Sequence, residues 1–383
     1  MPKMRKRKAV FIRSNPLDRD VRLPKEIAAL NQAGYSTKHI YWDRDRRADN
    51  LMDLKDHEAI PLKLRAPWGI KVIPLLPIWW GFVFTQLLLT RFDVVHVVNF
   101  DSVIPCIIAA RLKGKPVIYE ILDVYEELLP GGLRTICFAI DKFIMRFASS
   151  IIVADEEQIQ GIGGIPNRNI VAVYDSPPDD FSKKDARHQD NQVKGNFTLF
   201  YVGQLHRERR LNLDKVIEAI TDIEGVRLVV AGYGNMVEEI REISARMPGK
   251  IEFIGKISYG EVISRGLMAD LFFVLRDPIL PFYRYICGST LFNAMICGKP
   301  ILVNQGTSTT RKVSEENCGL VVNANDVEEI RQAIIKLRDN PQLCSELGAN
   351  ARRAYEQRYS WKIMGQRLVS LYHELTGEVN GAR

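Results

Sequence analysis

The strongest constraint on the fold is an alternation between short apolar runs and longer amphipathic segments, which occurs twice along the chain. The runs are rich in β-branched residues and have the length of buried strands. The segments between them have helical periodicity, and the first ends at Gly34, a typical helix stop. Strands that alternate with helices predict parallel, doubly wound sheets of the α/β class. The predicted strands are residues 8–14, 36–42, 92–99, 115–122 and 151–156 in the first half and 197–205, 226–234, 251–257, 270–276 and 300–305 in the second.

A polar, proline-bearing stretch separates the two halves, at residues 176–196. Such a stretch is typical of a linker between domains. The 383 residues, 46% of them hydrophobic, are enough for two separate cores. We therefore predict two Rossmann-like domains that face a cleft. The predicted boundaries are 1–180 for the first domain, 181–196 for the linker, 197–355 for the second domain, and 356–383 for a helical segment that could pack back on the first domain.

Net charge and cysteine content limit the possible partners and the cellular compartment only slightly. The net charge is +7, which suits a phosphate-bearing ligand or an anionic membrane but is also common in proteins with neither. The basic start, MPKMRKRK, is read as a solvated end, with a membrane or nucleic-acid patch as the alternative. The six cysteines are scattered, which is typical of reduced thiols in a cytosolic protein. We expect a cytoplasmic protein with no secretory signal and no nucleic-acid partner.

One uncharged stretch could contact lipid. Residues 73–90 read IPLLPIWWGFVFTQLLLT and lie between Lys71 and Arg91. The length is borderline for a membrane span, and two prolines interrupt its start. A buried or surface helix is one interpretation. The other is an interfacial helix with Trp79 and Trp80 at headgroup depth, which would hold the protein peripherally on a membrane.

Ligands of doubly wound sheets lie outside the carboxyl ends of the strands, and that rule selects the segments to inspect. In the first domain they are SNPLDRDVR, NFDS and LDVYEE. In the second domain, YVGQLHRERR follows a strand and precedes a helix, so Arg209 could bind a phosphate with Arg207 and Arg210 nearby. A solvated basic loop is the alternative. Gly232 and Gly234 follow the next strand, where they allow either close approach of a ligand or a tight turn.

The stretch CGSTLFNAMICGKP, residues 287–300, is a loop that enters a helix and turns into a strand. Free amides at the start of that helix could hold a second phosphate, and the next turn could hold a ribose. Phe292 and Met295 are expected to pack inward instead.

These segments, in their order and spacing, resemble glycosyltransferase family four, which has the GT-B fold. The second domain carries the resemblance through YVG, VAGYG, FIGKI, ADLFFV and LFNAMICGKPILV, and the first domain supports it through DRDVRLPKEIAAL and DVVHVVNFDSVIP. The resemblance implies a nucleotide sugar in the second domain, an acceptor in the first, and transfer with retention of anomeric configuration without a metal or other cofactor. It implies these donor-binding residues: Gly203, Gln204, Arg209, Gly232, Gly234, Tyr285, Ser289, Thr290, Leu291 and Asn293. The acceptor-side candidates are Asn15, Asp18, Arg22, Asn99 and Asp101.

The sequence departs from the family pattern at positions near the chemistry. The family usually has a glutamate at Asn293, where its carboxylate accepts hydrogen bonds from ribose, and another at Tyr285. A lysine or arginine is often found where this chain has Thr290. A His-Asp pair is common where this chain has Leu122 and Asp123. Asp123 therefore remains the candidate catalytic carboxylate, with a structural cap as its alternative role.

Two Asp-Arg-Asp triplets, at residues 18–20 and 43–45, look like the metal-binding pair of the other large glycosyltransferase fold. That fold has one sheet domain, whereas this sequence predicts two, so we interpret both triplets as loop carboxylates.

The sequence thus favours a retaining hexosyltransferase-type enzyme that moves a sugar from a nucleotide sugar to a glycan or lipid-linked acceptor at the inner membrane face. The alternative is an inactive relative that binds a nucleotide sugar or a partner enzyme. A sugar-nucleotide epimerase of the same fold is less favoured, because the acidic and histidine cluster expected in its cleft is not found. The donor base, sugar and linkage cannot be read from the sequence.

Overall fold

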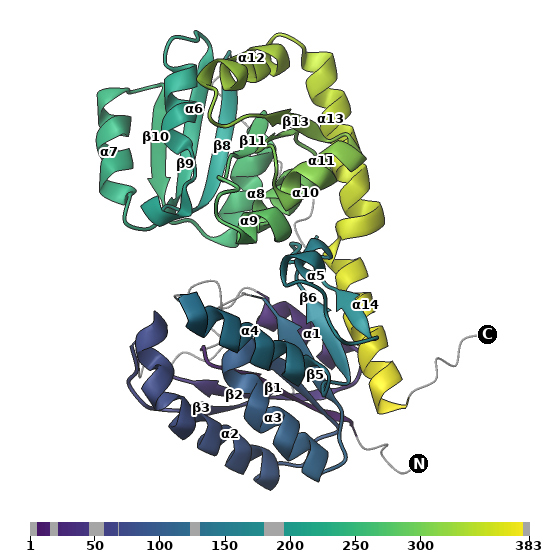
Figure 1. Cartoon of the computed structure of the whole chain (residues 1–383). Helices are drawn as coiled ribbons and strands as arrows, with labels where there is room; N and C mark the ends of the chain where they lie inside the picture. Colours follow the sequence, from purple (N-terminus) through teal and green to yellow (C-terminus); the bar gives the residue numbers. More distant parts are fainter. Residues whose placement is uncertain are drawn as a thin grey trace, which may run out of the picture. The chain divides into compact units, whose positions relative to one another are not determined.

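The computed structural model describes residues 6–15, 22–45, 57–67, 69–122, 131–179 and 195–377. The chain forms two compact units, Met1–Tyr174 with Met364–Arg383 and Asp175–Ile363 (Figure 1). Each unit contains its own parallel sheet with helices between the strands. The predicted α/β class with two doubly wound sheets is therefore confirmed.

The first unit is built on a seven-stranded sheet in the order β3-β2-β1-β4-β5-β6-β7. Neighbouring strands are parallel, and the order reverses between β1 and β4. The edge strands β3 and β7 were not predicted, because edge positions are only half-buried and have no continuous apolar run. The strands are β1 (Lys8–Arg13), β2 (Ser36–Trp42), β3 (His57–Leu62), β4 (Val94–Val98), β5 (Val117–Ile121), β6 (Ser150–Val153) and β7 (Ile170–Ala172).

Helices cover both faces of this sheet. On β4, Val95 and Val97 pack into the core beneath α2, α3 and α4, whereas His96 points to the opposite face. This division follows from the two-residue period of a strand. The helical segments are α1 (Leu23–Gln32), η2 (Gly69–Leu75), α2 (Leu76–Leu89), α3 (Phe100–Leu112), α4 (Gly131–Met145), α5 (Glu157–Gly161) and α14 (Trp361–Thr376).

The C-terminal helix α14 belongs to the first unit from Met364 onward. The hydroxyl of Tyr372 lies 2.8 Å from Nδ1 of His96, and the hydroxyls of Tyr35 and Thr376 are 2.9 Å apart. Arg367 donates to the carbonyl oxygen of Ala172 at 3.0 Å. Hydrogen bonds between residues so distant in sequence hold α14 against β4, β7 and the turn that precedes β2.

The start of the second unit lies earlier than predicted, at Asp175 instead of residue 197. The hydroxyl of Tyr355 donates to the carbonyl of Pro177 at 2.7 Å, and Arg352 pairs with Asp179 at 2.7 Å. These contacts attach residues 175–179 to α13 and to the start of η6. The predicted linker lies almost entirely outside the described residues.

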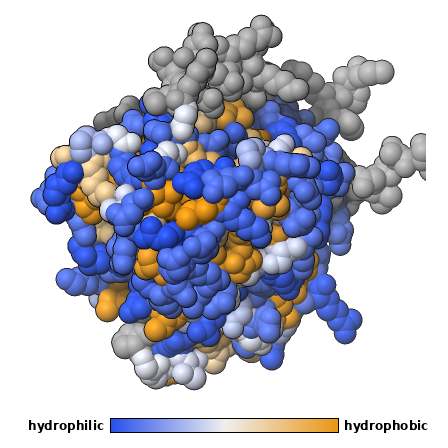
Figure 2. All heavy atoms as spheres, turned by 90° about the horizontal axis from the view of Figure 1, so that it is seen from above, coloured by the Kyte–Doolittle hydropathy of each residue, from blue (hydrophilic) through white to orange (hydrophobic). Residues whose placement is uncertain are grey.

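The second unit has a six-stranded parallel sheet in the order β10-β9-β8-β11-β12-β13, with a reversal between β8 and β11. Its strands are β8 (Phe197–Gln204), β9 (Val226–Tyr233), β10 (Ile251–Gly255), β11 (Leu271–Val274), β12 (Ile301–Asn304) and β13 (Gly319–Val322). The helical segments are η5 (Arg207–Arg209), α6 (Leu213–Ile220), α7 (Val237–Arg246), α8 (Tyr259–Met268), α9 (Phe282–Tyr285), α10 (Ser289–Cys297), α11 (Ser308–Glu316), α12 (Val327–Arg338), α13 (Pro341–Ala354) and the π-helix η6 (Tyr355–Tyr359). Figure 2 shows a mainly hydrophilic face on which hydrophobic residues are scattered in small groups.

The apolar stretch identified in the sequence forms η2 and α2. Gly69–Leu89 has a mean hydropathy of 1.8 and is the one helical stretch in the described chain with the length and composition to cross a membrane. Trp79 is fully buried, stacks on Trp42 and donates to Ser102 at 3.0 Å, while Trp80 donates to the carbonyl of Asp101 at 2.7 Å. The tryptophan pair therefore ties α2 to α3. Of the two interpretations of this stretch, the one that places Trp79 at headgroup depth is therefore wrong.

Candidate functional site

The strand order of the second unit reverses between β8 and β11, and this reversal marks a candidate site at the carboxyl ends of the two strands. Both strands end at the same edge of the sheet, and the loops that follow them leave in opposite directions. A crevice at such a reversal is where ligands bind in open parallel sheets. Gln204 ends β8 with its side chain exposed, and the loop after it contains three arginines.

Three predicted glycines have packing reasons for their positions. Gly203 of β8 pairs with Gly232 of β9, and a Cβ atom on Gly232 would collide with the carbonyl oxygen of Gly203. Gly234 has φ +148°, and its Cβ would collide with the carbonyl of Leu205. The backbones of the two loops consequently bond to each other, with Leu205 N donating to Tyr233 O at 2.8 Å. The glycines thus place the β8 loop rigidly beside the β9 loop.

The three loop arginines differ in their partners. Arg207 pairs with Glu239 at 2.6 Å, and Arg210 pairs with Asp277 at 3.0 Å. Arg209 has no carboxylate partner among the described residues. Its guanidinium carbon lies 5.6 Å from the ring centre of Phe282. Of the three, Arg209 therefore has the guanidinium that is available to bind an anion.

A second arginine without a carboxylate partner in the described chain, Arg276, follows the neighbouring strand β11. Its guanidinium lies 4.9 Å from the ring centre of Tyr283, and its buried Nε has no hydrogen-bond partner within the described residues. The Tyr283 hydroxyl donates to the carbonyl of Arg209 at 3.1 Å. Tyr283 thus connects the segments that carry both arginines. Arg276 was not among the predicted site residues, although it lies at the carboxyl end of a predicted strand next to the sheet reversal.

Arg276 also lies against the start of α10. The residue before the helix is Gly288, and no side chain caps the free amides of the first turn. A Cβ atom on Gly288 would lie 2.6 Å from Nη1 of Arg276, so glycine leaves room for the guanidinium beside the helix end. Free amides and the helix dipole both favour an anion at such an end. Arg209, Arg276 and the start of α10 together form an arrangement suited to a diphosphate.

The predicted residues on α10 differ in exposure. Ser289 is exposed and Tyr285, just before the helix, is partly exposed. Thr290, Leu291 and Asn293 are 3%, 0% and 5% exposed. The side chains of Thr290 and Leu291 therefore belong to the core, and only their backbone amides could contact a ligand.

Asn293 contacts a neighbouring helix. Its Oδ1 accepts a hydrogen bond from the hydroxyl of Tyr259 on α8 at 3.3 Å. Burial raises the pKa of that tyrosine, so the hydroxyl stays protonated and remains a donor. The Nδ2 of Asn293 makes no hydrogen bond within the described residues. The amide that replaces the expected carboxylate thus has its oxygen engaged and a donor left over.

The first sheet also reverses, between β1 and β4, and three of the predicted acceptor-side residues lie there. Ser14 and Asn15 follow β1, and Ser14 hydrogen-bonds to Asp101 in the first turn of α3. Burial raises the pKa of Asp101, although Ser14 and then Arg44 act in the opposite direction. Asn99 follows β4 with φ 65°, and its Oδ1 accepts from the amide of Leu122 at 3.0 Å. Asn99 thereby joins the ends of β4 and β5.

Some predicted positions lie outside the described residues. They include Asp18 and Asp123, and with them the first Asp-Arg-Asp triplet. In the second triplet Asp43 is buried, and Arg44 lies over the ring of Trp42 and 3.9 Å from Asp101.

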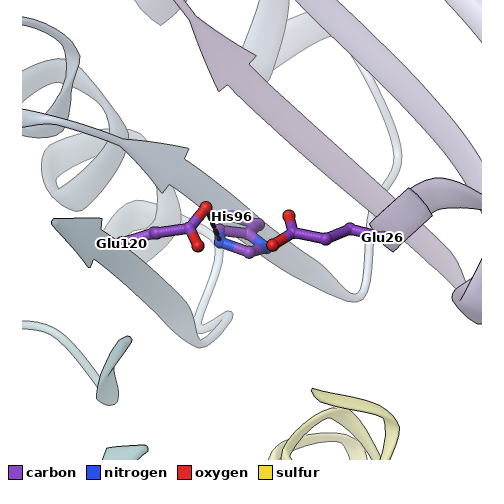
Figure 3. A group of neighbouring side chains, drawn as sticks. All are labelled: Glu26, His96 and Glu120. Carbon is purple, nitrogen blue, oxygen red and sulfur yellow. Dashed lines mark ion pairs between the residues drawn. The ribbon is translucent and has the colours of Figure 1, made fainter. Parts of the chain in front are cut away.

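Arg22, predicted on the acceptor side, is instead buried inside the first unit at 3% exposure. Its Nε donates to Glu26 at 2.8 Å, and its Nη2 pairs with Glu120. Nε2 of His96 lies 3.3 Å from Glu120, on the side away from Tyr372. Figure 3 shows Glu26 and Glu120 approaching the His96 ring from opposite sides. Because Arg22 is buried and paired with two glutamates, it does not lie at the surface where an acceptor could bind, and its prediction as an acceptor-side residue was wrong.

The Glu26, His96 and Glu120 ligand atoms lie within 4.8 Å of one another, which is close enough to hold a metal ion. Arg22, however, already supplies a positive charge to both carboxylates. Burial, and then the charge of Glu120, raise the pKa of Glu26 to about 8. Burial would also raise the pKa of Glu120, but Arg22 and then His96 outweigh it and lower that pKa to about 2. Glu26 therefore keeps its proton at neutral pH, and the charge of Arg22 neutralises the ionised Glu120. Since the charges are already balanced without a metal, we interpret the cluster as structural.

Known proteins resemble the chain in both sequence and structure. Residues 182–354 match the family model described as glycosyl transferases group 1. An uncharacterized glycosyltransferase of Methanocaldococcus jannaschii is 26% identical over 306 residues, which cover 77% of this chain and 71% of that protein. The GDP-mannose-dependent monoacylated alpha-(1-6)-phosphatidylinositol monomannoside mannosyltransferase of Corynebacterium glutamicum is 27% identical over 169 residues, 42% of this chain and 44% of that protein.

Among solved structures, the sucrose-phosphate synthase of Thermosynechococcus elongatus superimposes with a TM-score of 0.79 and 16% identity, covering 98% of this chain and 100% of that one. At this identity the likeness establishes the fold alone. The fold is the two-sheet architecture that the sequence resemblance implied.

Proposed function

We propose that this chain, which has the GT-B fold and matches the glycosyl transferases group 1 model over residues 182–354, is a glycosyltransferase that moves a sugar from a nucleotide sugar to an acceptor, with retention of anomeric configuration. The observation that carries the proposal is that Tyr283 connects the segments that carry Arg209 and Arg276, and that Arg276 lies beside the uncapped start of α10. Guanidinium groups that have no carboxylate partner in the described chain are available to make charge-assisted hydrogen bonds to phosphate oxygens.

The reaction needs such an arrangement at its leaving group. The bond between the sugar C1 and the donor diphosphate breaks, the acceptor oxygen forms the new bond to C1, and the proton of the acceptor hydroxyl passes to the leaving diphosphate oxygen and from there to water. Negative charge grows on the leaving diphosphate as that bond breaks. Guanidinium groups and helix amides already in position stabilise this charge more than the charge of the bound donor, and this difference accelerates transfer. We propose on the same ground that no divalent metal or other cofactor is required.

For the acceptor we propose a glycan or lipid-linked molecule at the inner membrane face, bound by the first unit. Asn15, Asn99 and Asp101 lie at the reversal of its sheet, where parallel sheets bind ligands. The corynebacterial relative acts, by its name, on a phosphatidylinositol mannoside.

A second candidate function is nucleotide-sugar binding without transfer. Leu122 occupies the end of β5, where a histidine would be expected, and cannot exchange a proton. Asn293 carries no charge and has its oxygen bonded to Tyr259. Neither feature alters Arg209, Arg276 or the start of α10, so a diphosphate could still bind. Both features change residues that would lie near the sugar and the ribose.

The experiment is a calorimetric titration of the full chain with nucleoside diphosphates, followed by a panel of nucleotide sugars. Arg209→Ala should weaken binding, and Arg207→Ala is the matched control because Arg207 is paired with Glu239 on the same loop. Equal affinity of the two variants would reject the site. Turnover of the tightest donor with acceptor present, measured by released nucleoside diphosphate, then separates the enzyme from the binder.

A further inference from the structure

Exposed apolar side chains are concentrated on one part of the first unit. Of the fourteen large hydrophobic side chains exposed in the described chain, ten lie between Ile70 and Phe143. Eight of them lie on three helices that pack side by side, α2, α3 and α4 (Figure 1). We call this set the three-helix face. Its members, with their exposures, are Ile78 (52%), Leu88 (40%), Leu89 (75%), Ile108 (49%), Leu112 (69%), Ile136 (57%), Ile140 (41%) and Phe143 (56%).

Printed contacts join these helices into one surface. Lys113, after α3, donates to the carbonyls of Leu87 and Leu88 at 2.7 Å and so brings the ends of α2 and α3 together. Arg111 lies 4.4 Å from the ring centre of Phe147, which itself packs edge-on against Phe143 at 4.9 Å. The groove between α3 and α4 has a volume of about 430 Å³ and is lined mainly by isoleucine, leucine and phenylalanine. An apolar surface this continuous is typical of a contact site.

The charges on the three-helix face have one sign. Residues 69–90 contain no acidic residue, and Asp101 and Asp141 are the acids of α3 and α4. Asp141 is 4% exposed and accepts from Tyr119 at 2.8 Å, while Asp101 hydrogen-bonds to Ser14. Basic residues remain exposed around the apolar side chains. They are Lys71, Arg91, Arg111 and Arg146.

We propose that the three-helix face binds an anionic phospholipid bilayer, with the helices lying along its surface. Apolar side chains enter the boundary between headgroups and acyl chains, and the surrounding cations attract the lipid phosphates. A peripheral surface fits better than a span, because α2 buries Trp79, Val83 and Leu87 in the protein core. The proposal rests on the proposed function in one respect, since it would bring the protein to a lipid-linked acceptor.

Vesicle flotation of the full chain tests the proposal. The protein should float with phosphatidylcholine vesicles that contain phosphatidylglycerol, and much less with phosphatidylcholine alone. The triple variant Leu89→Ser, Leu112→Ser, Phe143→Ser should reduce the partition coefficient about tenfold or more, because burial of one large apolar side chain accounts for about a factor of ten. The residues are exposed, so the fold should be kept. Arg91→Glu should weaken binding most at low salt, where charges are least screened.

The matched control is Val321→Ser, which removes an exposed apolar side chain from the second unit and should leave flotation unchanged. Equal flotation of the triple variant and the parent would overturn the proposal. So would loss of a dimer in sedimentation without any change in flotation, since the surface would then bind a second copy. Nucleotide affinity, measured on the same samples, separates the two proposals: it should be unchanged in the triple variant, and its absence in the parent would count against the donor site alone.

Discussion

The guanidinium of Arg276 occupies the space that a side chain on Gly288 would need. A Cβ atom there would lie 2.6 Å from Nη1 and 3.1 Å from Cζ of Arg276. Arg276 follows β11 and Gly288 precedes α10, and their contact places a positive charge at the uncapped start of α10. The backbone conformation does not require glycine here, because a φ of −80° is open to any residue. The position of the Arg276 guanidinium does require it, because a larger residue would collide with that group.

Gly288→Ala should displace Arg276 and weaken binding of a nucleoside diphosphate by about 1.5 kcal/mol, the value of one hydrogen bond to a charged group. The melting temperature should change little, since a flexible side chain can move aside. Calorimetry and thermal unfolding of the same variant provide the comparison. Full nucleotide affinity would show that Arg276 does not contact the phosphates.

Arg209→Ala should cost about 2 to 3 kcal/mol in nucleoside diphosphate binding, because a charge-assisted hydrogen bond is lost in a partly buried site. Arg207→Ala and Arg210→Ala should cost far less, since both arginines already pair with carboxylates. Titration of the three variants under one set of conditions makes the comparison. Equal losses in all three would mean that the loop acts only through its total charge.

Asn293→Leu and Tyr259→Phe should separate a ligand contact from a helix contact. Each removes the 3.3 Å hydrogen bond between α8 and α10, at a cost of about 1 kcal/mol in unfolding free energy. If Nδ2 of Asn293 binds the donor, Asn293→Leu should abolish donor binding while Tyr259→Phe retains it. Asn293→Glu should tighten binding if the side chain reaches the ribose, because a carboxylate accepts stronger bonds. Identical donor affinities in Asn293→Leu and the parent would make Asn293 a packing residue.

The buried Glu26 should make the first unit less stable as the pH rises. Its pKa of about 8 in the folded chain lies above the ordinary value, so unfolding above pH 4.5 releases a proton that the fold retains. Stability attributable to this proton is full below about pH 4.5 and is lost as the pH approaches 8, by at most about 1.4 kcal/mol per pH unit. Glu26→Gln should flatten this slope. Glu58→Gln is the control, because Glu58 is exposed and its pKa is lowered by hydrogen bonds to Lys8 and Lys38.

Transfer activity, once a donor is identified, should survive a chelator. Arg209, Arg276 and the α10 amides supply the positive charge that a metal provides in other sites. Rates measured with EDTA, and again after adding Mg²⁺ or Mn²⁺, should agree. Loss with EDTA and recovery with either metal would show that another group completes the site.

Local patterns sufficed for the central strands and for part of the site. The runs at residues 8–14, 92–99 and 197–205 identify buried strands because strands covered on both faces are continuously apolar. The rule for parallel sheets then pointed to Arg209 and to the start of α10, because it depends only on where strands end. Edge strands such as β3 were not found, since half-buried strands lack that pattern.

The sequence by itself determined the alternation of strands and helices, the two-sheet architecture and the segments at the sheet reversals, because these depend on periodicity within a few residues. The tertiary structure decided which charges are already paired. It buried Arg22 between Glu26 and Glu120, engaged Arg207 and Arg210, and set Arg276 beside Gly288. It also turned Trp79 toward Trp42 and left the three-helix face exposed. Apart from Arg22 and Glu26, which are four residues apart, these partners come from different elements and meet only once strand order and helix packing are established, and no local pattern records that order.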